Sequence, residues 1–167
     1  MLKARNLALV LTIFLWATLL GGIVYSHIVF FPVYLSALPD SAVLVHGPYA
    51  LHDERFWMLI HPLLTLSIIL SLVLNWKLKK RRKLIAITAG IYALAIVATT
   101  LFFVPELIAF QGSPESSVSR ADWFARGQRW QYLSWLRGIV MYAGFVPLLL
   151  ALVESTENVR ETNRARA

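Results

Sequence analysis

Four long apolar segments constrain what this chain can fold into more than any other feature of its sequence. A helix needs about 20 apolar residues to cross the roughly 30 Å hydrocarbon core of a bilayer. Each segment meets that length, and only 15% of the 167 residues are charged, against about 25% in soluble domains. The sequence therefore predicts an all-α, four-helix transmembrane bundle that forms a single domain over residues 1–167. The expected spans are residues 7–34, 56–76, 84–110 and 131–153.

The distribution of basic residues predicts how the bundle sits in its membrane. Lysine and arginine collect on the cytoplasmic flanks of membrane helices. The two termini and the run at residues 77–83 hold eleven of them, and five lie toward the other side. Both termini are therefore expected in the cytoplasm (N-in and C-in) of a bacterial plasma, or inner, membrane. Because each basic cluster directly flanks an apolar span, we expect it to meet the lipid bilayer and not nucleic acid.

A segment that mixes tryptophan, phenylalanine and arginine precedes the fourth span, at residues 121–130. Aromatic and basic side chains favour the boundary between lipid and water. We therefore expect a short extra interfacial helix in this segment.

Each span carries one ionisable residue near its outer end: His27, His61, Glu106 and Arg137. A charged side chain at the centre of a membrane helix costs about 2.5–3.5 kcal/mol on insertion scales, so it usually faces the bundle interior and has a partner. Pro32 follows His27 closely and is expected to kink the first helix and free a carbonyl nearby. Four such residues at about one level predict a polar site near the outer leaflet.

Two interpretations of this site remain open. In the structural one, Glu106 and Arg137 form an ion pair and each histidine hydrogen-bonds a neighbouring helix. In the functional one, His27, His61 and Glu106 hold a divalent metal, or the histidines hold haem, and Arg137 binds an anionic substrate group or a haem propionate. The chain has no cysteine, which excludes thiolate ligands and cysteine nucleophiles.

A catalytic version of the site assigns the histidines and the arginine to the reaction itself. His27 and His61 would act as ligands or general bases, and Arg137 would stabilise a developing oxyanion. The side chains expected to bind or line a substrate are Tyr25, Trp57, Glu106 and Tyr142.

The outer loop between the first two spans holds two further histidines, His46 and His52. The dipeptide Gly47-Pro48 between them predicts a turn that folds the loop over the mouth of the bundle. We expect solvated histidines here, and a lid that supplies one more ligand is the alternative.

Three stretches of the chain carry a family resemblance. They are the glycine-rich run closed by proline at residues 21–32 (GGIVYSHIVFFP), the apolar stretch closed by proline at residues 101–105 (LFFVP), and the Trp-then-Arg helix at residues 130–137 (WQYLSWLR). In this layout the chain resembles the DUF1772 family of small four-span membrane proteins, which includes the anthrone-oxygenase-like proteins. The resemblance implies oxygenation of an aromatic or quinone-like substrate. The family often has a histidine about three residues before the arginine of the fourth helix, where this chain has Ser134.

Two functions of different classes remain after this reading. The first is a redox or oxygenase-type membrane protein that takes an apolar aromatic or quinone-like small molecule, with or without haem or a metal. The second is a non-catalytic accessory or scaffold subunit, bound to a membrane-protein partner or to further copies of itself. Small residues spaced by four in the first span, such as Ala17 and Gly21, let helices approach closely and suit the second function. A transporter is disfavoured, because the polar residues cluster at one end of the spans.

Overall fold

The computed structural model describes residues 2–112 and 118–164, and describes side chains over residues 3–112 and 118–154. Four helical segments are long and apolar enough to cross a membrane, which confirms the predicted fold class. They are Lys3–Ser36, Glu54–Leu74, Lys79–Gln111 and Arg120–Glu154. In chain order the elements are α1 (Leu2–Tyr25), the π-helix η1 (Ser26–Phe30), α2 (Phe31–Ser36), the 3-10 helix η2 (Asp40–Leu44), α3 (Glu54–Leu74), α4 (Lys79–Ala98), the π-helix η3 (Thr99–Phe103), α5 (Val104–Gln111) and α6 (Arg120–Arg164).

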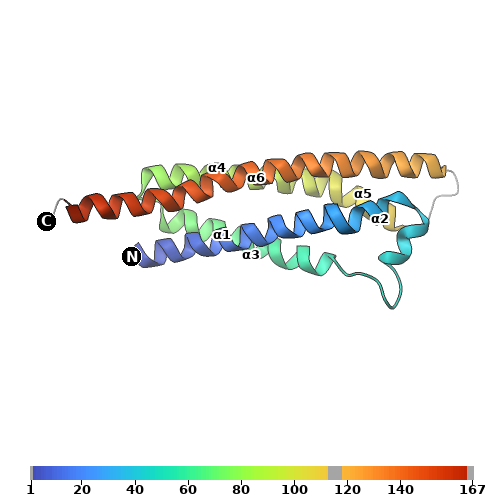
Figure 1. The fold of residues 1–167 in the computed structure, drawn as a ribbon, viewed down its shortest axis with the longest axis horizontal. Helices are drawn as coiled ribbons and strands as arrows, with labels where there is room; N and C mark the ends of the chain where they lie inside the picture. Colours follow the sequence, from blue (N-terminus) through green and yellow to red (C-terminus); the bar gives the residue numbers. More distant parts are fainter. Residues whose placement is uncertain (1, 113–117, 165–167) are drawn as a thin grey trace.

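The four spans run up and down side by side, so the two chain ends and the turn between α3 and α4 lie at the same end of the bundle (Figure 1). This arrangement is the one that the predicted N-in, C-in orientation requires. We call the end with the termini the inner end, and the end with α2, η2 and α5 the outer end.

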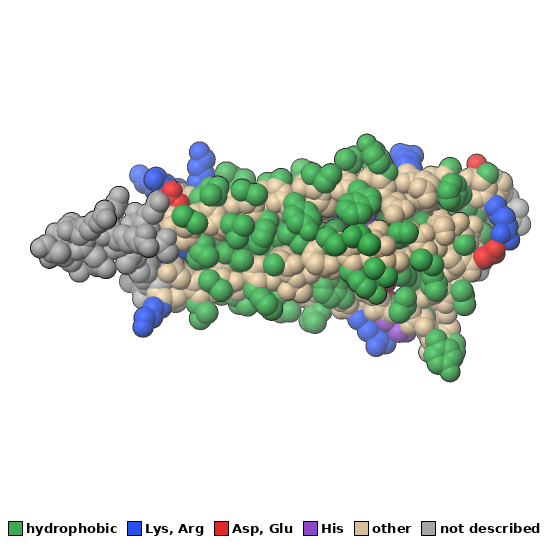
Figure 2. Space-filling model, viewed as in Figure 1, with side chains coloured by type: hydrophobic (Ala, Val, Ile, Leu, Met, Phe, Trp, Pro, Cys, Tyr) green, Lys and Arg blue, Asp and Glu red, His purple; other side chains and the backbone are tan. Residues whose placement is uncertain are grey.

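Side chains on the surface of the bundle match a protein surrounded by lipid. On the visible face, hydrophobic side chains cover the length of the bundle, and lysine and arginine gather toward its two ends (Figure 2). The exposed side chains of the middle belt include Phe14, Leu66, Leu94 and Ile139, all more than half exposed. In water such an apolar surface would be unfavourable. In a bilayer it contacts lipid tails, which are as apolar as the side chains themselves.

The residues predicted to form a separate interfacial helix, 121–130, are helical but belong to α6, which is continuous from Arg120 to Arg164. Ser119 caps this helix, because its hydroxyl oxygen accepts a hydrogen bond from the backbone N–H of Asp122 at 3.1 Å. The aromatic side chains of the segment do not lie at the lipid surface as a group. Trp123 and Trp130 are 5% and 2% exposed and pack into the bundle, which holds the segment in line with the span.

Two hydrophobic clusters fill the bundle, one toward each end. The inner cluster is mostly aliphatic, and its buried members are Leu9, Trp16, Leu19, Leu20, Ile23, Ile60, Leu64, Ile68, Ile85, Tyr92, Ala95, Met141, Leu148 and Ala151. The outer cluster is mostly aromatic, and its buried members are Phe30, Phe31, Tyr34, Leu35, Leu38, Phe103, Phe110, Trp123 and Trp130.

Two prolines explain where the helices widen into π turns. In η1 the backbone N–H of Phe31 donates to the carbonyl of Ser26, and Pro32 follows directly. In η3 the N–H of Val104 donates to the carbonyl of Thr99, and Pro105 follows directly. Proline has no N–H and its ring clashes with the carbonyl four residues earlier, so the preceding turn opens to make room. Single π turns of this kind are frequent at functional sites, and both lie in the outer half.

Candidate functional site

His27 lies in η1 and is buried, with only 2% of its surface exposed. Its Nδ1 is 2.7 Å from the carbonyl oxygen of Ile23, and a carbonyl only accepts, so Nδ1–H is the donor. In the neutral ring Nε2 is then an acceptor, and this buried atom has no hydrogen-bond partner among the described residues. The ring contacts Trp135 and Phe31, with centroids 4.6 Å and 5.4 Å away. A buried polar atom without a partner is costly, so it marks a place where a ligand can bind.

Arg137 of α6 lies close by and has only neutral partners. Its guanidinium donates to the hydroxyl of Thr99 at 2.8 Å and to the hydroxyl of Ser134 at 3.0 Å. It also lies over the ring of Phe103, 4.1 Å from the centroid. Within the described part of the chain no carboxylate pairs with it, and its charge acts on both His27 and His61. The charge of this membrane-embedded arginine is therefore available to an anionic or carbonyl oxygen of a ligand.

The predicted ion pair between Glu106 and Arg137 is wrong. Glu106 instead accepts two hydrogen bonds from Arg126, at 3.0 Å and 3.2 Å. The reason is that α5 and α6 are antiparallel, so residues later in α5 lie opposite residues earlier in α6. Arg137 comes eleven residues after Arg126, which puts it about 16 Å deeper in the bundle at 1.5 Å per residue.

His61 belongs to a second polar group, deeper in the bundle. Its Nδ1 is 2.9 Å from the hydroxyl of Tyr92, which also donates to the backbone carbonyl of His61 at 3.2 Å. Trp57, one turn before it on α3, stacks on its ring at 6.0 Å between centroids. Trp57 Nε1–H in turn donates to Asp53 at 3.3 Å, just outside the span, where burial raises the pKa of the Asp53 carboxyl above its ordinary value.

The backbone positions of the two histidines differ in depth. Gly22 of α1 is so close to the rings of Phe56 and Trp57 that a Cβ there would collide with Phe56, which fixes the register of α1 and α3. His27 lies beyond this contact toward the outer end, and His61 lies beyond it toward the inner end. The combined offset of nine to ten residues corresponds to about 14 Å along the axis. The hydrogen bonds of the predicted residues therefore differ: Glu106 pairs with Arg126, His61 with Tyr92, and Arg137 with Thr99 and Ser134. We call His27, Arg137 and the side chains that contact them the His27 group.

This separation removes the predicted metal triad. Nowhere among the described side chains, residues 3–112 and 118–154, do three histidine or carboxylate groups come together in a way that could hold a metal ion. His27, His61 and Glu106 each have different hydrogen-bond partners, so they do not fit a common metal.

The remaining predicted residues lie away from the His27 group. Tyr25 and Tyr142 are 61% and 47% exposed on the outside of the bundle. In the loop, Nε2–H of His46 donates to the carbonyl of Gln111 at 2.6 Å, and His52 pairs with Glu54 at 2.9 Å. The turn at Gly47 is present, with φ of 93°. Both histidines are exposed, and neither ring is buried in the bundle.

Four residues of the site were not among the predicted ones: Thr99, Phe103, Ser134 and Trp135. Ser134 carried a usable signal, because it lies three residues before Arg137 and so on the same helix face. Thr99 and Phe103 carried none, since their place depends on the register between α4 and α6.

Comparisons of the chain with known protein families, with curated proteins and with solved structures gave no match.

Proposed function

We propose that the protein is a redox or oxygenase-type membrane protein, and that His27 and Arg137 bind the oxygen-bearing ring of an apolar aromatic or quinone-like molecule. One observation carries the proposal: the charge of Arg137 acts on buried His27, whose Nε2 has no partner, and Arg137 itself has hydroxyl partners and no carboxylate among the described residues. A ring that carries a hydroxyl group beside a carbonyl satisfies both, since the hydroxyl donates a hydrogen to Nε2 and the carbonyl oxygen accepts from the guanidinium.

The pair also suits proton abstraction. Nε2 of His27 can take a proton from an acidic ring C–H or O–H, and Arg137 can stabilise the negative charge that develops on the ring oxygen. With dioxygen as oxidant, a ring CH₂ opposite a carbonyl in the same ring becomes a second C=O, one oxygen atom enters the product, and the other leaves as water with the two hydrogens of the CH₂. This is the reaction type that the resemblance to the anthrone-oxygenase-like proteins implies. Since Ser134 stands where that family often has a histidine, the base in this chain would be His27.

An apolar substrate would reach this pair from the lipid. Trp135 contacts the buried ring of His27 and is itself 39% exposed on the outside of α6. A substrate dissolved in the bilayer would therefore pass Trp135 to reach Nε2. This entry suits a protein of a bacterial inner membrane, with both termini in the cytoplasm and the site toward the outer leaflet.

Quenching of tryptophan fluorescence by a hydroxylated naphthoquinone, titrated into purified protein in lipid nanodiscs, tests the binding step. We expect His27→Phe and Arg137→Met each to raise the Kd about tenfold, the order of a lost hydrogen bond to a charged group. Arg126→Gln is the matched control, because it removes an arginine of the same helix that pairs with Glu106. Equal affinity in all four proteins would refute the site.

Oxygen consumption with an anthrone-type substrate tests the catalytic step separately. We expect uptake by the wild type and none by His27→Phe. Binding without oxygen uptake would leave the accessory or scaffold function, which the exposure of Ala17 and Gly21 on α1 favours. In that case co-purification in mild detergent should recover a larger assembly.

A further inference from the structure

A groove at the inner end carries a feature that the His27 group does not explain. It has a volume of about 530 Å³, opens to the surroundings between α3 and α4, and is lined by Leu72, Trp76, Lys79, Arg82, Lys83 and Ala86. Among these described residues three are basic and none is acidic, so the groove has a net positive lining. Its other three side chains are apolar.

The polar and apolar parts of the groove lie at different depths. Trp76 and Lys79 belong to the turn and to the first residue of α4. Leu72 lies four residues before Trp76 and Ala86 four residues after Arg82, which is about 6 Å deeper into the membrane region on each helix. A ligand that fits has an anionic head at the bundle end and an apolar chain that runs between the helices.

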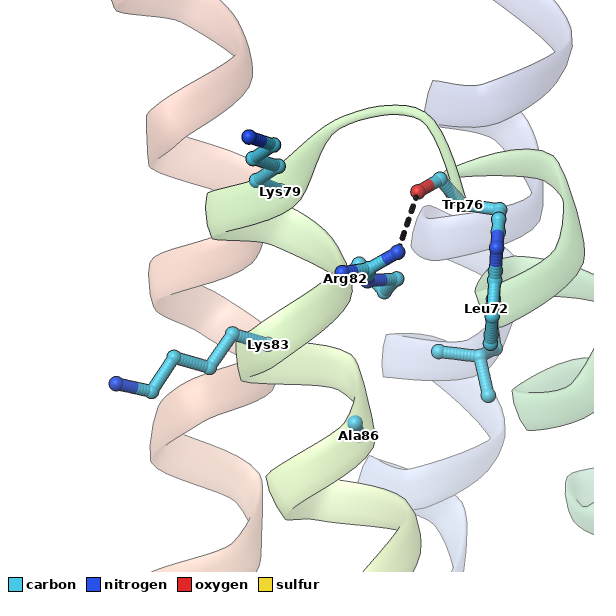
Figure 3. Close-up of a pocket in the computed structure, with 6 residues that line it drawn as sticks. All are labelled: Leu72, Trp76, Lys79, Arg82, Lys83 and Ala86. Carbon is cyan, nitrogen blue, oxygen red and sulfur yellow. Dashed lines mark hydrogen bonds between the residues drawn. The ribbon is translucent and has the colours of Figure 1, made fainter.

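Arg82 is held in place at the mouth. It projects from α4 toward Trp76, whereas Lys79 and Lys83 project away from Trp76 (Figure 3). The guanidinium carbon lies 5.0 Å from the centroid of the Trp76 ring, and one nitrogen is 3.5 Å from the Trp76 carbonyl. A guanidinium stacked on an indole loses little freedom when it binds a phosphate, and its remaining N–H groups suit two phosphate oxygens.

A second groove of about 240 Å³ lies on another side of Trp76 and is lined by Ala4, Arg5, Val73, Leu74, Trp76 and Lys77. It repeats the same combination of apolar and basic side chains, again without an acidic one among its described residues. The pattern is therefore a property of the whole inner end around Trp76.

We propose that the groove between α3 and α4 is a binding site for an anionic phospholipid. Its phosphate lies against Arg82, and one acyl chain lies along Leu72 and Ala86. Basic pockets between membrane helices on the cytoplasmic side bind such headgroups. The site is independent of the His27 group and of any reaction there.

Native mass spectrometry of the full chain tests this site. The protein in detergent is mixed with equal amounts of phosphatidylglycerol and phosphatidylcholine that have identical acyl chains. We expect the wild type to retain phosphatidylglycerol at least fivefold more often, roughly the factor that one basic residue near a membrane surface supplies. Equal retention of the two lipids would overturn the proposal, and this measurement needs no variant.

Neighbouring residues give the matched variants. Arg82→Gln should lower retention of phosphatidylglycerol about fivefold. Lys79→Gln should lower it less, because the side chain of Lys79 projects away from Trp76. Lys80→Gln removes the same charge one position away, from a side chain that is 81% exposed, pairs with Glu154 and does not line the groove. It should leave retention unchanged. An equal loss in all three variants would indicate diffuse attraction to the basic run, and displacement by millimolar glycerol phosphate would indicate a site for free phosphate; either result overturns the proposal.

Discussion

The inner and outer halves of the bundle are packed from different side chains and along different helices. The inner half joins regular α-helices through an aliphatic cluster, and side-chain hydrogen bonds such as those of Thr12 and Thr88 cross between helices. The outer half holds an aromatic cluster, and the π turns η1 and η3 lie in this half. The unpartnered Nε2 of His27 belongs to the outer half.

This difference indicates how one short chain can combine a firm frame with a reactive site. Regular helices joined by interhelical hydrogen bonds hold the inner half in register. In the outer half Pro32 and Pro105 widen the helices and turn His27, Thr99 and Phe103 toward α6. Large aromatic rings fill the irregular space that this widening leaves, because each ring covers a wide area with few rotatable bonds.

The largest expected effect concerns Trp130, the centre of the outer cluster. Its ring meets Phe31 and Phe103 edge to face, and Nε1–H donates to the carbonyl of Phe103 at 3.0 Å. Trp130→Ala should lower the free energy of unfolding by about 3–5 kcal/mol, as for other large aromatic truncations in a core. Unfolding in a sodium dodecyl sulfate titration measures it. Tyr132→Ala, at a position 65% exposed on the same helix, is the control and should change little.

A smaller effect tests whether proline causes the π turns. In Pro32→Ala the new N–H can bond the carbonyl of residue 28 and let η1 return to an α-helix. One added hydrogen bond of about 1 kcal/mol should slow amide hydrogen exchange at residues 27–31 roughly fivefold. Pro62→Ala serves as control, because α3 contains Pro62 without a π turn. If exchange at residues 27–31 did not change, packing of His27 rather than the proline would be the cause of the widening.

Much of the fold could be predicted from the sequence because bilayer thickness imposes it. Apolar segments of more than 20 residues separated by basic clusters leave few arrangements other than an up-and-down bundle. The continuity of α6 could not be read in this way. Trp123 and Trp130 have the composition of an interfacial anchor, and only their packing against α2 and α5 shows that they are core residues.

The site was predictable in part, for a reason that Glu106 and Arg137 make clear. Each was expected to need a partner, and each has one. The identity of that partner depends on how the antiparallel helices are aligned along their axes. A shift of one helical turn gives every residue a different neighbour. Hydropathy contains no information on that register. His27 was found because a titratable residue inside a glycine-rich and proline-closed span is conspicuous by itself.

In the inner half, a hydrogen bond of Thr12 joins two helices. The hydroxyl hydrogen of Thr12 is within reach of two carbonyls, that of Ala8 in its own helix at 2.9 Å and that of Ser67 in α3 at 3.0 Å. The Thr12 oxygen also lies 2.8 Å from the hydroxyl of Ser71, so Thr12 links α1 to α3. Thr12→Val keeps the shape and should lower the free energy of unfolding by about 0.6 kcal/mol, the mean for interhelical hydrogen bonds in membranes. Thr18→Val is matched to it, because Thr18 donates only to Phe14 of its own helix. A loss of equal size in both variants would mean that the cross-helix bond contributes nothing.

The smallest expected effect is a change of Tm with pH that depends on Asp53 at the outer end and not on Lys80 at the inner end. Burial, together with the charge of Glu54, raises the pKa of the Asp53 carboxyl at the outer end. The folded state therefore binds this proton more tightly than the unfolded state, and the contribution of Asp53 to stability falls as pH rises through the interval between the unfolded and the folded pKa. Asp53→Asn cannot lose a proton and keeps an oxygen for Trp57, so its Tm should equal that of the wild type at pH 4 or below and exceed it at pH 7. Lys80→Gln at the inner end gives the comparison, since it leaves the Asp53 carboxyl in place, and its Tm difference from the wild type should be the same at both pH values. A Tm difference between Asp53→Asn and the wild type that stayed constant from pH 4 to pH 7 would contradict the raised pKa of Asp53. The carboxyl would then be as exposed to water as an ordinary surface group.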